Sequence, residues 1–354
     1  MKKFPRYDDV GTFPLPENID KEKFEQFYWT AYRAIVNQNK EYLIEHSGIN
    51  HYFFNPINQA FQFKLKSGLD IVNYPQYMDM IIQFLKPISD YEIEPDLIDP
   101  KKAYIPEMVV LENFAKEHYD QTGKSFEVKI CITGPIELYI KKHNFTIYLD
   151  LAINFAKSIN SFLKNSIINN KYVKTTVVAI DEPSFGYVEL FNINNEEIIM
   201  ILDKSLEGLN TINQIHLHSL KQAYVPLQTK NIDVLTCEYA SDPTNKIPKK
   251  DLEQYDKFIR VGITRTNIDN IIAEKIETGK TWEDLKSYKG MLSLIDSKER
   301  IKKNLLKALE LYDERLKYIG PDCGLKGWRI PEIAYELLCR TYEVIEEVKK
   351  SFNL

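Results

Sequence analysis

Short runs of β-branched and aliphatic residues alternate along the chain with longer segments in which apolar residues recur at helical spacing. Six of these runs predict buried strands, and two weaker ones raise the number to eight. Residues 151–165, 196–209 and 297–316 are typical of the amphipathic helices between them; the last carries Ile301, Leu305, Leu309 and Leu316 on one face. The eight predicted strands are 8–13, 69–73, 127–133, 175–181, 211–217, 231–238, 257–263 and 316–322.

Eight strands that alternate with helices predict an α/β protein with a parallel sheet, and the number eight favours a (β/α)₈ TIM barrel. Residues 90–107 are rich in Pro, Asp and Ile, and we interpret them as an insertion after the second strand. No internal repeat or low-complexity segment divides the chain. We therefore expect a single domain over residues 1–354.

Composition narrows the class of protein. The chain is 44% hydrophobic and 27% charged, which is typical of a soluble globular protein. Its formal net charge of -5 argues against nucleic acid or an anionic membrane as the main partner. The N-terminus lacks the apolar region of a signal peptide, and the four cysteines include no CxxC pair. We expect a reduced, cytoplasmic protein without a membrane or nucleic-acid partner.

The predicted strand ends carry residues that bind metals. Active groups of a (β/α)₈ barrel lie at the carboxyl ends of its strands, where this chain places His216, His218, Glu238 and Cys323. Residues i and i+2 of a strand share a face, so the two histidines can present both imidazoles to one point. Taken singly, a buried Cys is more often a small hydrophobic residue and a strand-end Glu is more often solvated. Together on one rim, the four predict a zinc site.

The other cysteines have different expected roles. Cys237 and Glu238 are neighbours on a predicted strand, so their side chains point to opposite faces and only one of them reaches a metal. We expect Cys237 to pack in the core. Cys131 and Cys339 are predicted to be structural.

Several short motifs together resemble a known family. They come in the order GTFPLP (11–16), TGP (133–135), DEP (181–183), HLH (216–218), CEYAS (237–241) and PDCGLK (321–326). The set resembles the C-terminal catalytic domain of cobalamin-independent methionine synthase, and it extends over nearly the whole chain without the N-terminal half of the full-length members. Corrinoid:thiol methyltransferases and uroporphyrinogen decarboxylases are more distantly similar. The resemblance implies a short, single-barrel core form.

In that family a zinc ion binds the acceptor thiol and keeps it as the thiolate, which is the nucleophile. The family pattern is His-x-Cys, then Glu, then Cys. His216, Glu238 and Cys323 match it, whereas His218 stands where Cys is expected. Histidine brings no negative charge, so the resemblance implies a stronger Lewis acid and a slower thiolate.

The resemblance also implies how the acceptor homocysteine is held. Asp181 matches the carboxylate that pairs with the amino group, and it is our candidate catalytic residue; a helix cap is the alternative role. Gly11 and Thr12 match the Gly-Ser whose backbone meets the substrate carboxylate. Gln76 lies near the position of a second family carboxylate, and an amide cannot neutralise an ammonium group.

The residues expected to bind a folate donor are absent. The family tryptophan falls near Lys141, the pterin-binding Glu falls near Tyr187, and no histidine follows His218 to act as proton donor. A folate amine needs a proton to leave, whereas cob(I)alamin does not. We therefore expect methylcobalamin, or a corrinoid carrier protein, as the methyl donor.

These observations predict a zinc-dependent methyltransferase that moves a methyl group from a corrinoid to a small-molecule thiol, with homocysteine giving methionine. A second interpretation keeps the chemistry and changes the thiol, for example to coenzyme M. A third, of another class, is a barrel without catalysis that serves as a binding or partner subunit. Metal content separates the third from the others, and competition between thiols separates the first two.

Overall fold

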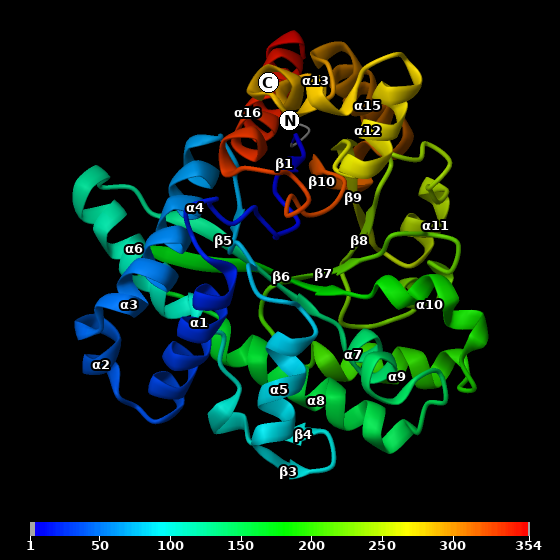
Figure 1. Cartoon of the computed structure of the whole chain (residues 1–354). Coiled ribbons are helices and arrows are strands. Elements are labelled where there is room, and N and C mark those ends of the chain that lie inside the picture. The colour runs from blue at the N-terminus through cyan, green and yellow to red at the C-terminus, as the bar shows by residue number, and fades with distance from the viewer. Residues whose placement is uncertain (1–3, 353–354) are drawn as a thin grey trace.

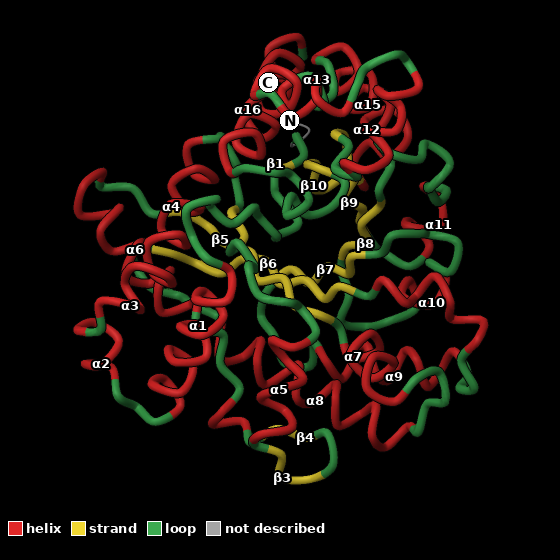
Figure 2. Tube along the Cα trace, in the orientation of Figure 1, coloured by secondary structure: helices red, strands yellow, loops and turns green. Residues whose placement is uncertain are grey.

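Eight parallel strands follow one another round a ring in the computed structural model, which describes residues 4–352 (Figures 1 and 2). Each strand pairs with the next in the order β1-β10-β9-β8-β7-β6-β5-β2. A parallel bridge between Asp8, just after β1, and Ile71, just before β2, joins the two ends of this sheet. The predicted (β/α)₈ barrel is thereby confirmed. Its strands are β1 (Arg6–Tyr7), β2 (Val72–Asn73), β5 (Phe126–Thr133), β6 (Val173–Asp181), β7 (Ile212–His216), β8 (Val234–Cys237), β9 (Phe258–Thr264) and β10 (Leu316–Pro321).

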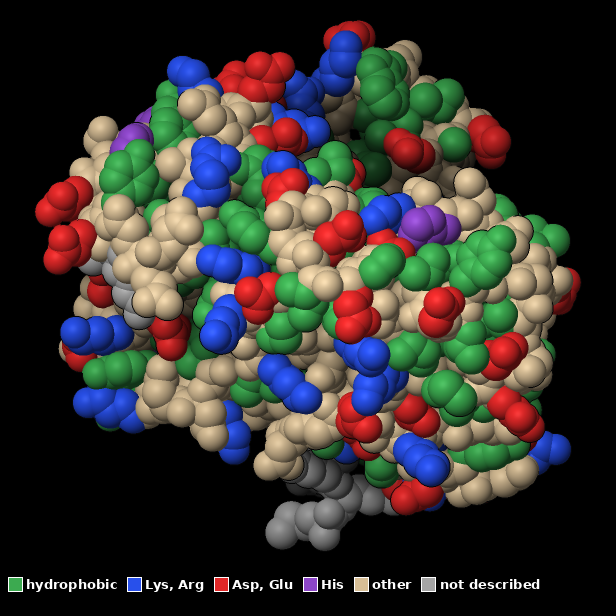
Figure 3. Space-filling view, turned by 90° about the horizontal axis from the view of Figure 1, so that it is seen from below, with side chains coloured by type: hydrophobic (Ala, Val, Ile, Leu, Met, Phe, Trp, Pro, Cys, Tyr) green, Lys and Arg blue, Asp and Glu red, His purple; other side chains and the backbone are tan. Residues whose placement is uncertain are grey.

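Helices surround the ring on its outside (Figure 1). Local signals start several of them: the Asp20 side chain accepts a hydrogen bond from the Lys23 amide at 2.8 Å, and Asn194 with Glu197 forms a capping box. None of the helices within residues 4–352 combines the length and the apolar character that crossing a bilayer requires. On the face seen in Figure 3, acidic and basic side chains are interspersed with apolar ones. The helices of the first half are α1 (Lys21–Val36), α2 (Lys40–Glu45), α3 (Ser47–Ile49), α4 (Asn55–Lys66), α5 (Ile82–Asp90), α6 (Glu107–Thr122), α7 (Pro135–His143) and α8 (Leu149–Ser166). Those of the second half are α9 (Asn195–Ser205), α10 (Tyr224–Leu227), α11 (Lys249–Gln254), α12 (Ile268–Glu277), α13 (Trp282–Lys286), α14 (Tyr288–Leu292), α15 (Lys298–Tyr312) and α16 (Pro331–Ser351).

The predicted insertion after the second strand is a small antiparallel hairpin, β3 (Glu92–Glu94) with β4 (Leu97–Ile98). Asp96 at its turn has a φ of +63° and a buried side chain. The carboxylate of Asp96 contacts Lys142 Nζ at 2.5 Å and His143 Nε2 at 2.7 Å. The insertion is therefore tied to α7, the helix that follows β5.

Two layers of side chains fill the interior of the barrel below the carboxyl ends of the strands. The first is apolar and comes from every second strand, as expected for this fold. The second layer comes from the intervening strands and is polar. The apolar layer is Ile71, Val177, Val234 and Tyr318, and the polar layer is Asp8, Lys129, Gln214 and Arg260.

Asp8 holds the polar layer together. Its carboxylate contacts Lys129 Nζ at 2.8 Å and Arg260 Nε at 2.5 Å, and all three side chains are buried. Burial alone would raise the pKa of Asp8, but Arg260 and Lys129 hold it below its ordinary value. Arg260 Nη1 is buried without a hydrogen-bond partner among the described residues, and a buried ion pair of this kind fixes one arrangement more than it adds stability. This layer forms a rigid, charged floor beneath the carboxyl ends of the strands.

The structure corrects three predicted boundaries. The first strand covers Arg6–Tyr7 and not 8–13, because the chain leaves the sheet after Asp8 and Gly11 has a φ of +153°. The helix predicted over 196–209 ends at Ser205, before a turn in which Gly208 has a φ of +73°. The helix predicted over 297–316 ends at Tyr312, so Leu316 is not on its apolar face but begins β10.

Glu107, the first residue of α6, is fully buried, and neither carboxylate oxygen has a hydrogen-bond partner among the described residues. Burial raises the pKa of this carboxyl group to about 8. In the unfolded chain the carboxyl group of Glu107 ionises near its ordinary pKa of 4.5. The free energy of unfolding therefore falls as the pH rises from 4.5 toward 8. One pKa unit corresponds to about 1.4 kcal/mol, which makes the loss roughly 3 kcal/mol at neutral pH.

Glu107→Gln should therefore raise the melting temperature at slightly alkaline pH, by about 3 °C or more, because the amide stays neutral. The advantage should vanish below the ordinary pKa of a glutamate. Thermal denaturation across this pH range tests it, with the exposed Glu112→Gln on the same helix as control. If Glu107→Gln changed the melting temperature by the same amount at every pH, the pKa of Glu107 would not be raised in the folded protein.

Candidate active site

Four side chains of types that can bind a metal meet at the carboxyl ends of β7, β8 and β10. They are His216, His218, Glu238 and Cys323, and one ligand atom from each lies within 4.8 Å of all the others. His216 Nε2 is 3.5 Å from Cys323 Sγ and 3.8 Å from Glu238 Oε1, and His218 Nε2 is 3.8 Å from the same oxygen. Zinc bonds of roughly 2.0–2.3 Å give tetrahedral edges of about 3.3–3.8 Å. These three distances match such edges and the full set lies within 4.8 Å, so the cluster offers N, O and S donors that would move slightly closer together around zinc.

A threonine on the neighbouring strand orients His216. The register of β7 with β8 places Thr236 beside His216, and its Oγ1 lies 2.9 Å from His216 Nδ1. When Nδ1–H donates to this oxygen, Nε2 keeps its lone pair and faces the cluster. Such partners commonly fix the tautomer of metal-binding histidines. Burial, then the neighbouring His218, keeps the pKa of His216 well below its usual value, so the ring is neutral.

The sequence predicts that His216 and His218 share a face because both lie on one predicted strand. The strand β7 ends at His216, so strand alternation does not determine the orientation of His218. The two imidazole rings still lie 5.4 Å apart between centroids. The side chain of His218 is 49% exposed, whereas that of His216 is 2% exposed. His218 is thus the member of the cluster that solvent reaches most easily.

The segments that carry Glu238 and Cys323 are bound to each other. Asp322, next to Cys323, accepts hydrogen bonds from the amides of Ala240 at 3.0 Å and Ser241 at 2.7 Å. The Cys323 amide donates to Thr266 Oγ1 at 3.1 Å. Cys237 is fully buried away from the cluster, in agreement with a core role.

The electrostatics of the cluster favour a bound cation. Burial, then Asp322, raises the pKa of Glu238 to about 8, and burial, then Glu238, raises the pKa of Cys323 well above its usual value. Burying a carboxylate and a thiol this close together costs free energy unless a positive charge compensates. A dication would reverse both shifts, because it stabilises the deprotonated donors.

Two carboxyl groups lie beside the cluster. Asp181 ends β6, and the register of β6 with β7 places it next to His216. Its Oδ1 is buried and has no hydrogen-bond partner within residues 4–352. Burial, then the charge of Glu137, raises the pKa of Asp181 to about 7. No signal in the sequence distinguishes Glu137, since an acid in the first turn of a helix is common.

Glu137 belongs to α7 and is 4% exposed. It accepts a hydrogen bond from the Ser184 amide at 3.1 Å and lies 3.3 Å from Lys141 Nζ. Glu182 accepts from the amides of Ile136 at 3.0 Å and Glu137 at 2.8 Å, so it caps the start of α7. The helical turn that follows Asp181, Pro183–Leu190, has no side-chain cap, so Asp181 Oδ1 remains available to a ligand among the described residues.

The other predicted substrate-binding residues lie together on the neighbouring part of the rim. A side chain at Gly11 would come within 2.0 Å of Gln76 Oε1, so only glycine permits this contact. Thr12 accepts a hydrogen bond from the Leu325 amide at 2.7 Å, which joins it to the segment after Cys323. Gln76 is buried with a φ of +49°, and its Nε2 donates to the Cys131 carbonyl at 2.5 Å.

Three positions depart from the folate-binding pattern that the resemblance implies, and the structure shows what each of these side chains contacts. Lys141 is half exposed beside Glu137, and Tyr187 is 61% exposed. Asn267 caps α12, where its Oδ1 accepts a hydrogen bond from the Asn270 amide at 3.3 Å. None of these three positions carries an imidazole.

Comparisons with known proteins agree with the motifs. No protein-family model matches the chain. Methionine synthase from Sulfolobus acidocaldarius is 26% identical over 246 residues, which cover 67% of this chain and 61% of that protein. Methionine synthase from Saccharolobus solfataricus is 22% identical over an alignment that covers 96% of this chain and 95% of that protein.

Solved structures share the fold. A B12-independent methionine synthase from Shewanella sp. W3-18-1, in complex with selenomethionine, has a TM-score of 0.59 at 18% identity and covers 99% of both chains. A putative vitamin-B12-independent methionine synthase from Listeria monocytogenes has a TM-score of 0.55 at 12% identity, covering 98% of this chain and 99% of that one. The chain is thus related in sequence to methionine synthases and has the barrel fold of their B12-independent form, as its motifs predict.

Proposed function

We propose that this chain is a zinc-dependent methyltransferase that transfers a methyl group to the thiol of homocysteine, giving methionine, with a methyl-corrinoid as donor. The cluster of His216, His218, Glu238 and Cys323 carries the proposal. Relatives named methionine synthase support transfer of a methyl group to a thiol. We propose that one catalytic domain covers residues 1–354.

The residues of the cluster would hold the zinc ion, and its charge would keep a thiol deprotonated near neutral pH. Thr236 holds the ring of His216 in place, and Asp322 holds the two loops that carry Glu238 and Cys323. These contacts hold three of the four donors near one another.

The carboxyl groups beside the cluster favour an acceptor thiol with an amino group. Asp181 has an unpartnered buried oxygen, and Glu137 acts on it electrostatically. An ammonium group would satisfy Asp181 and lower its pKa from about 7. Coenzyme M is a sulfonate anion, which these two carboxyl groups would repel. We propose that Glu137 takes the place of the family carboxylate for which Gln76 is a poor substitute.

Asp181→Asn should raise the KM for homocysteine by about 10- to 150-fold, because a charged hydrogen bond contributes roughly 1.5–3 kcal/mol. The KM for 4-mercaptobutyrate, which has the same thiol and carboxylate without the amine, should change little. Glu137→Gln should act in the same direction and more weakly. Steady-state kinetics with both thiols tests this, and the exposed Glu189→Gln serves as control. Equal effects of Asp181→Asn on both thiols would leave Asp181 with a structural role only.

The donor is inferred from the side chains that could assist a leaving group. Asn267, Lys141 and Tyr187 stand where the family has a proton donor and pterin contacts, and each is engaged with its own helix or exposed. A corrinoid leaves without a proton. Methyl transfer from methylcobalamin to a panel of thiols, with zinc present, tests the whole proposal. Formation of methionine from homocysteine is the expected result, and no transfer to any thiol by zinc-loaded protein would overturn it.

A further inference from the structure

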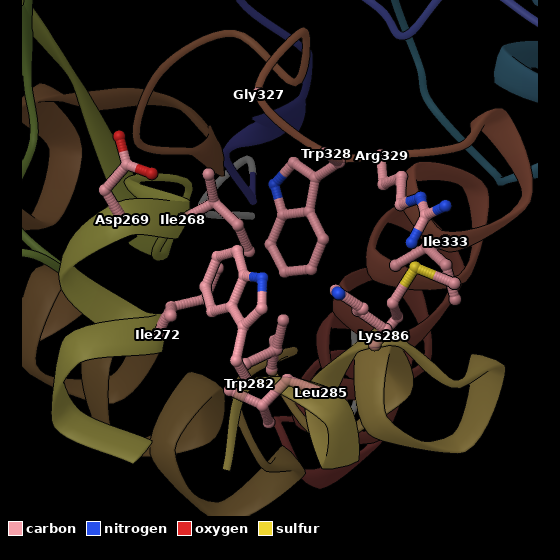
Figure 4. Close-up of a pocket in the computed structure, with 12 residues that line it drawn as sticks. Ile268, Asp269, Ile272, Trp282, Leu285, Lys286, Gly327, Trp328, Arg329 and Ile333 are labelled. Atoms are coloured by element: carbon pink, nitrogen blue, oxygen red, sulfur yellow. The ribbon is translucent and has the colours of Figure 1, made fainter. Parts of the chain in front are cut away.

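A cavity of about 370 Å³ lies apart from the metal-binding cluster, between α12, α13, α14 and the segment that leads into α16. Its volume is in the range of small-molecule sites. Figure 4 shows the indole rings of Trp282 and Trp328 turned into this space. Arg329 and Lys286 lie together on one side of it, and Asp269 lies on the other.

The two tryptophans give the cavity an apolar wall and one exposed flat ring, that of Trp282. Trp282 is 53% exposed although it is large and apolar, whereas Trp328 is 2% exposed. Trp328 Nε1 is buried and has no hydrogen-bond partner among residues 4–352. Trp328 therefore forms part of the cavity wall, and the exposed ring of Trp282 is the surface on which a ligand ring can stack. Aromatic side chains in such positions bind rings by stacking.

The two cations leave most of their donors available. Lys286 Nζ contacts Glu283 at 2.6 Å and Arg329 Nε contacts Glu17 at 3.3 Å, and both glutamates are exposed. Ion pairs of this kind are weak in water. An ammonium and a guanidinium beside an exposed indole ring suit a phosphate that is attached to a flat base.

We propose that this cavity binds the base and phosphate of a nucleotide-like ligand, with the ring against Trp282 and Trp328 and the phosphate at Lys286 and Arg329. Two sources share this chemistry: a free nucleotide, and the benzimidazole nucleotide tail of a corrinoid. The proposal that the cavity binds a nucleotide depends only on the geometry of the cavity. The identification of that nucleotide as part of a corrinoid also rests on the proposed function. The segment from Gly327 to Arg329 begins four residues after Cys323, so a ligand here would contact the same loop that carries one residue of the metal-binding cluster.

Calorimetric titration of the full chain tests the proposal with four probes: AMP, α-ribazole 5′-phosphate, methylcobalamin and methylcobinamide, which lacks the nucleotide tail. We expect the two nucleotides to bind. Trp282→Leu should weaken them about tenfold or more, and Lys286→Met should weaken them by about tenfold. Lys289→Met, an exposed lysine on the adjacent helix, should change nothing.

The two corrinoid probes distinguish a free nucleotide from the nucleotide tail of a corrinoid as the ligand of the cavity. Tighter binding of methylcobalamin than of methylcobinamide, lost in Trp282→Leu, assigns the cavity to a corrinoid tail; equal binding assigns it to a free nucleotide. Absence of binding by both nucleotides, or binding that both variants leave unchanged, overturns the proposal. Methyl transfer from methylcobinamide to homocysteine does not need this cavity, so it reports separately on the proposed function.

Discussion

Cys323→Ser should reduce the zinc content of the purified protein from about one ion per chain to a small fraction, and should abolish methyl transfer. The thiolate is one of four donors whose ligand atoms lie within 4.8 Å of one another. Changes to outer-shell partners alone commonly reduce metal affinity by roughly 10–100-fold, so the loss of a ligand atom should cost about 1000-fold or more. Elemental analysis after dialysis against a chelator measures the effect.

Two further variants make this test specific. Cys339→Ser removes a half-buried cysteine of α16 outside the cluster and should leave the zinc content unchanged. His218→Ala removes the most exposed donor and should weaken zinc less than Cys323→Ser does. Equal zinc in the Cys323 and Cys339 variants would remove Cys323 from the site. Unchanged affinity in His218→Ala would leave that histidine with no role in metal binding.

The architecture could be predicted because its signals are local. The central runs of β-branched residues became strands near their predicted bounds, and the residues at their carboxyl ends could be placed on one rim by the rule for this fold. The first strand was misplaced because only two residues form it, and its partners lie more than 60 and 300 residues away in the chain. Hydrophobic pattern carries little information about so short a strand.

The supporting residues of the site depend on register, which the sequence does not show. Thr236 orients His216 only because β7 and β8 align in one way. Asp8, Lys129 and Arg260 lie far apart in sequence, and they form the floor of the site because alternate strands contribute to the same layer. In the sequence Glu137 is an ordinary acid in the first turn of a helix, and only the fold brings it close enough to act electrostatically on Asp181.

The second large expected effect concerns the choice of methyl donor. Methylcobalamin should support methionine formation, whereas methyltetrahydrofolate should give none that can be detected. A folate nitrogen must be protonated as the methyl group leaves, and a general acid typically contributes about 100- to 10,000-fold. The position expected for that acid is Asn267, whose side chain caps α12 through its bond to the Asn270 amide.

Asn267→His provides the decisive comparison, because it restores an imidazole at this position without restoring the pterin contacts. We expect no folate activity in this variant, since Lys141 and Tyr187 still stand where the family has a tryptophan and a glutamate. Activity with methylcobalamin should persist, because a corrinoid leaves as a stable anion and takes no proton from the protein. The assay is methionine formation by zinc-loaded, corrinoid-free protein with each donor in turn. Turnover of methyltetrahydrofolate by the unmodified chain would show that another group supplies the proton, and the ordinary family mechanism would then replace the corrinoid donor.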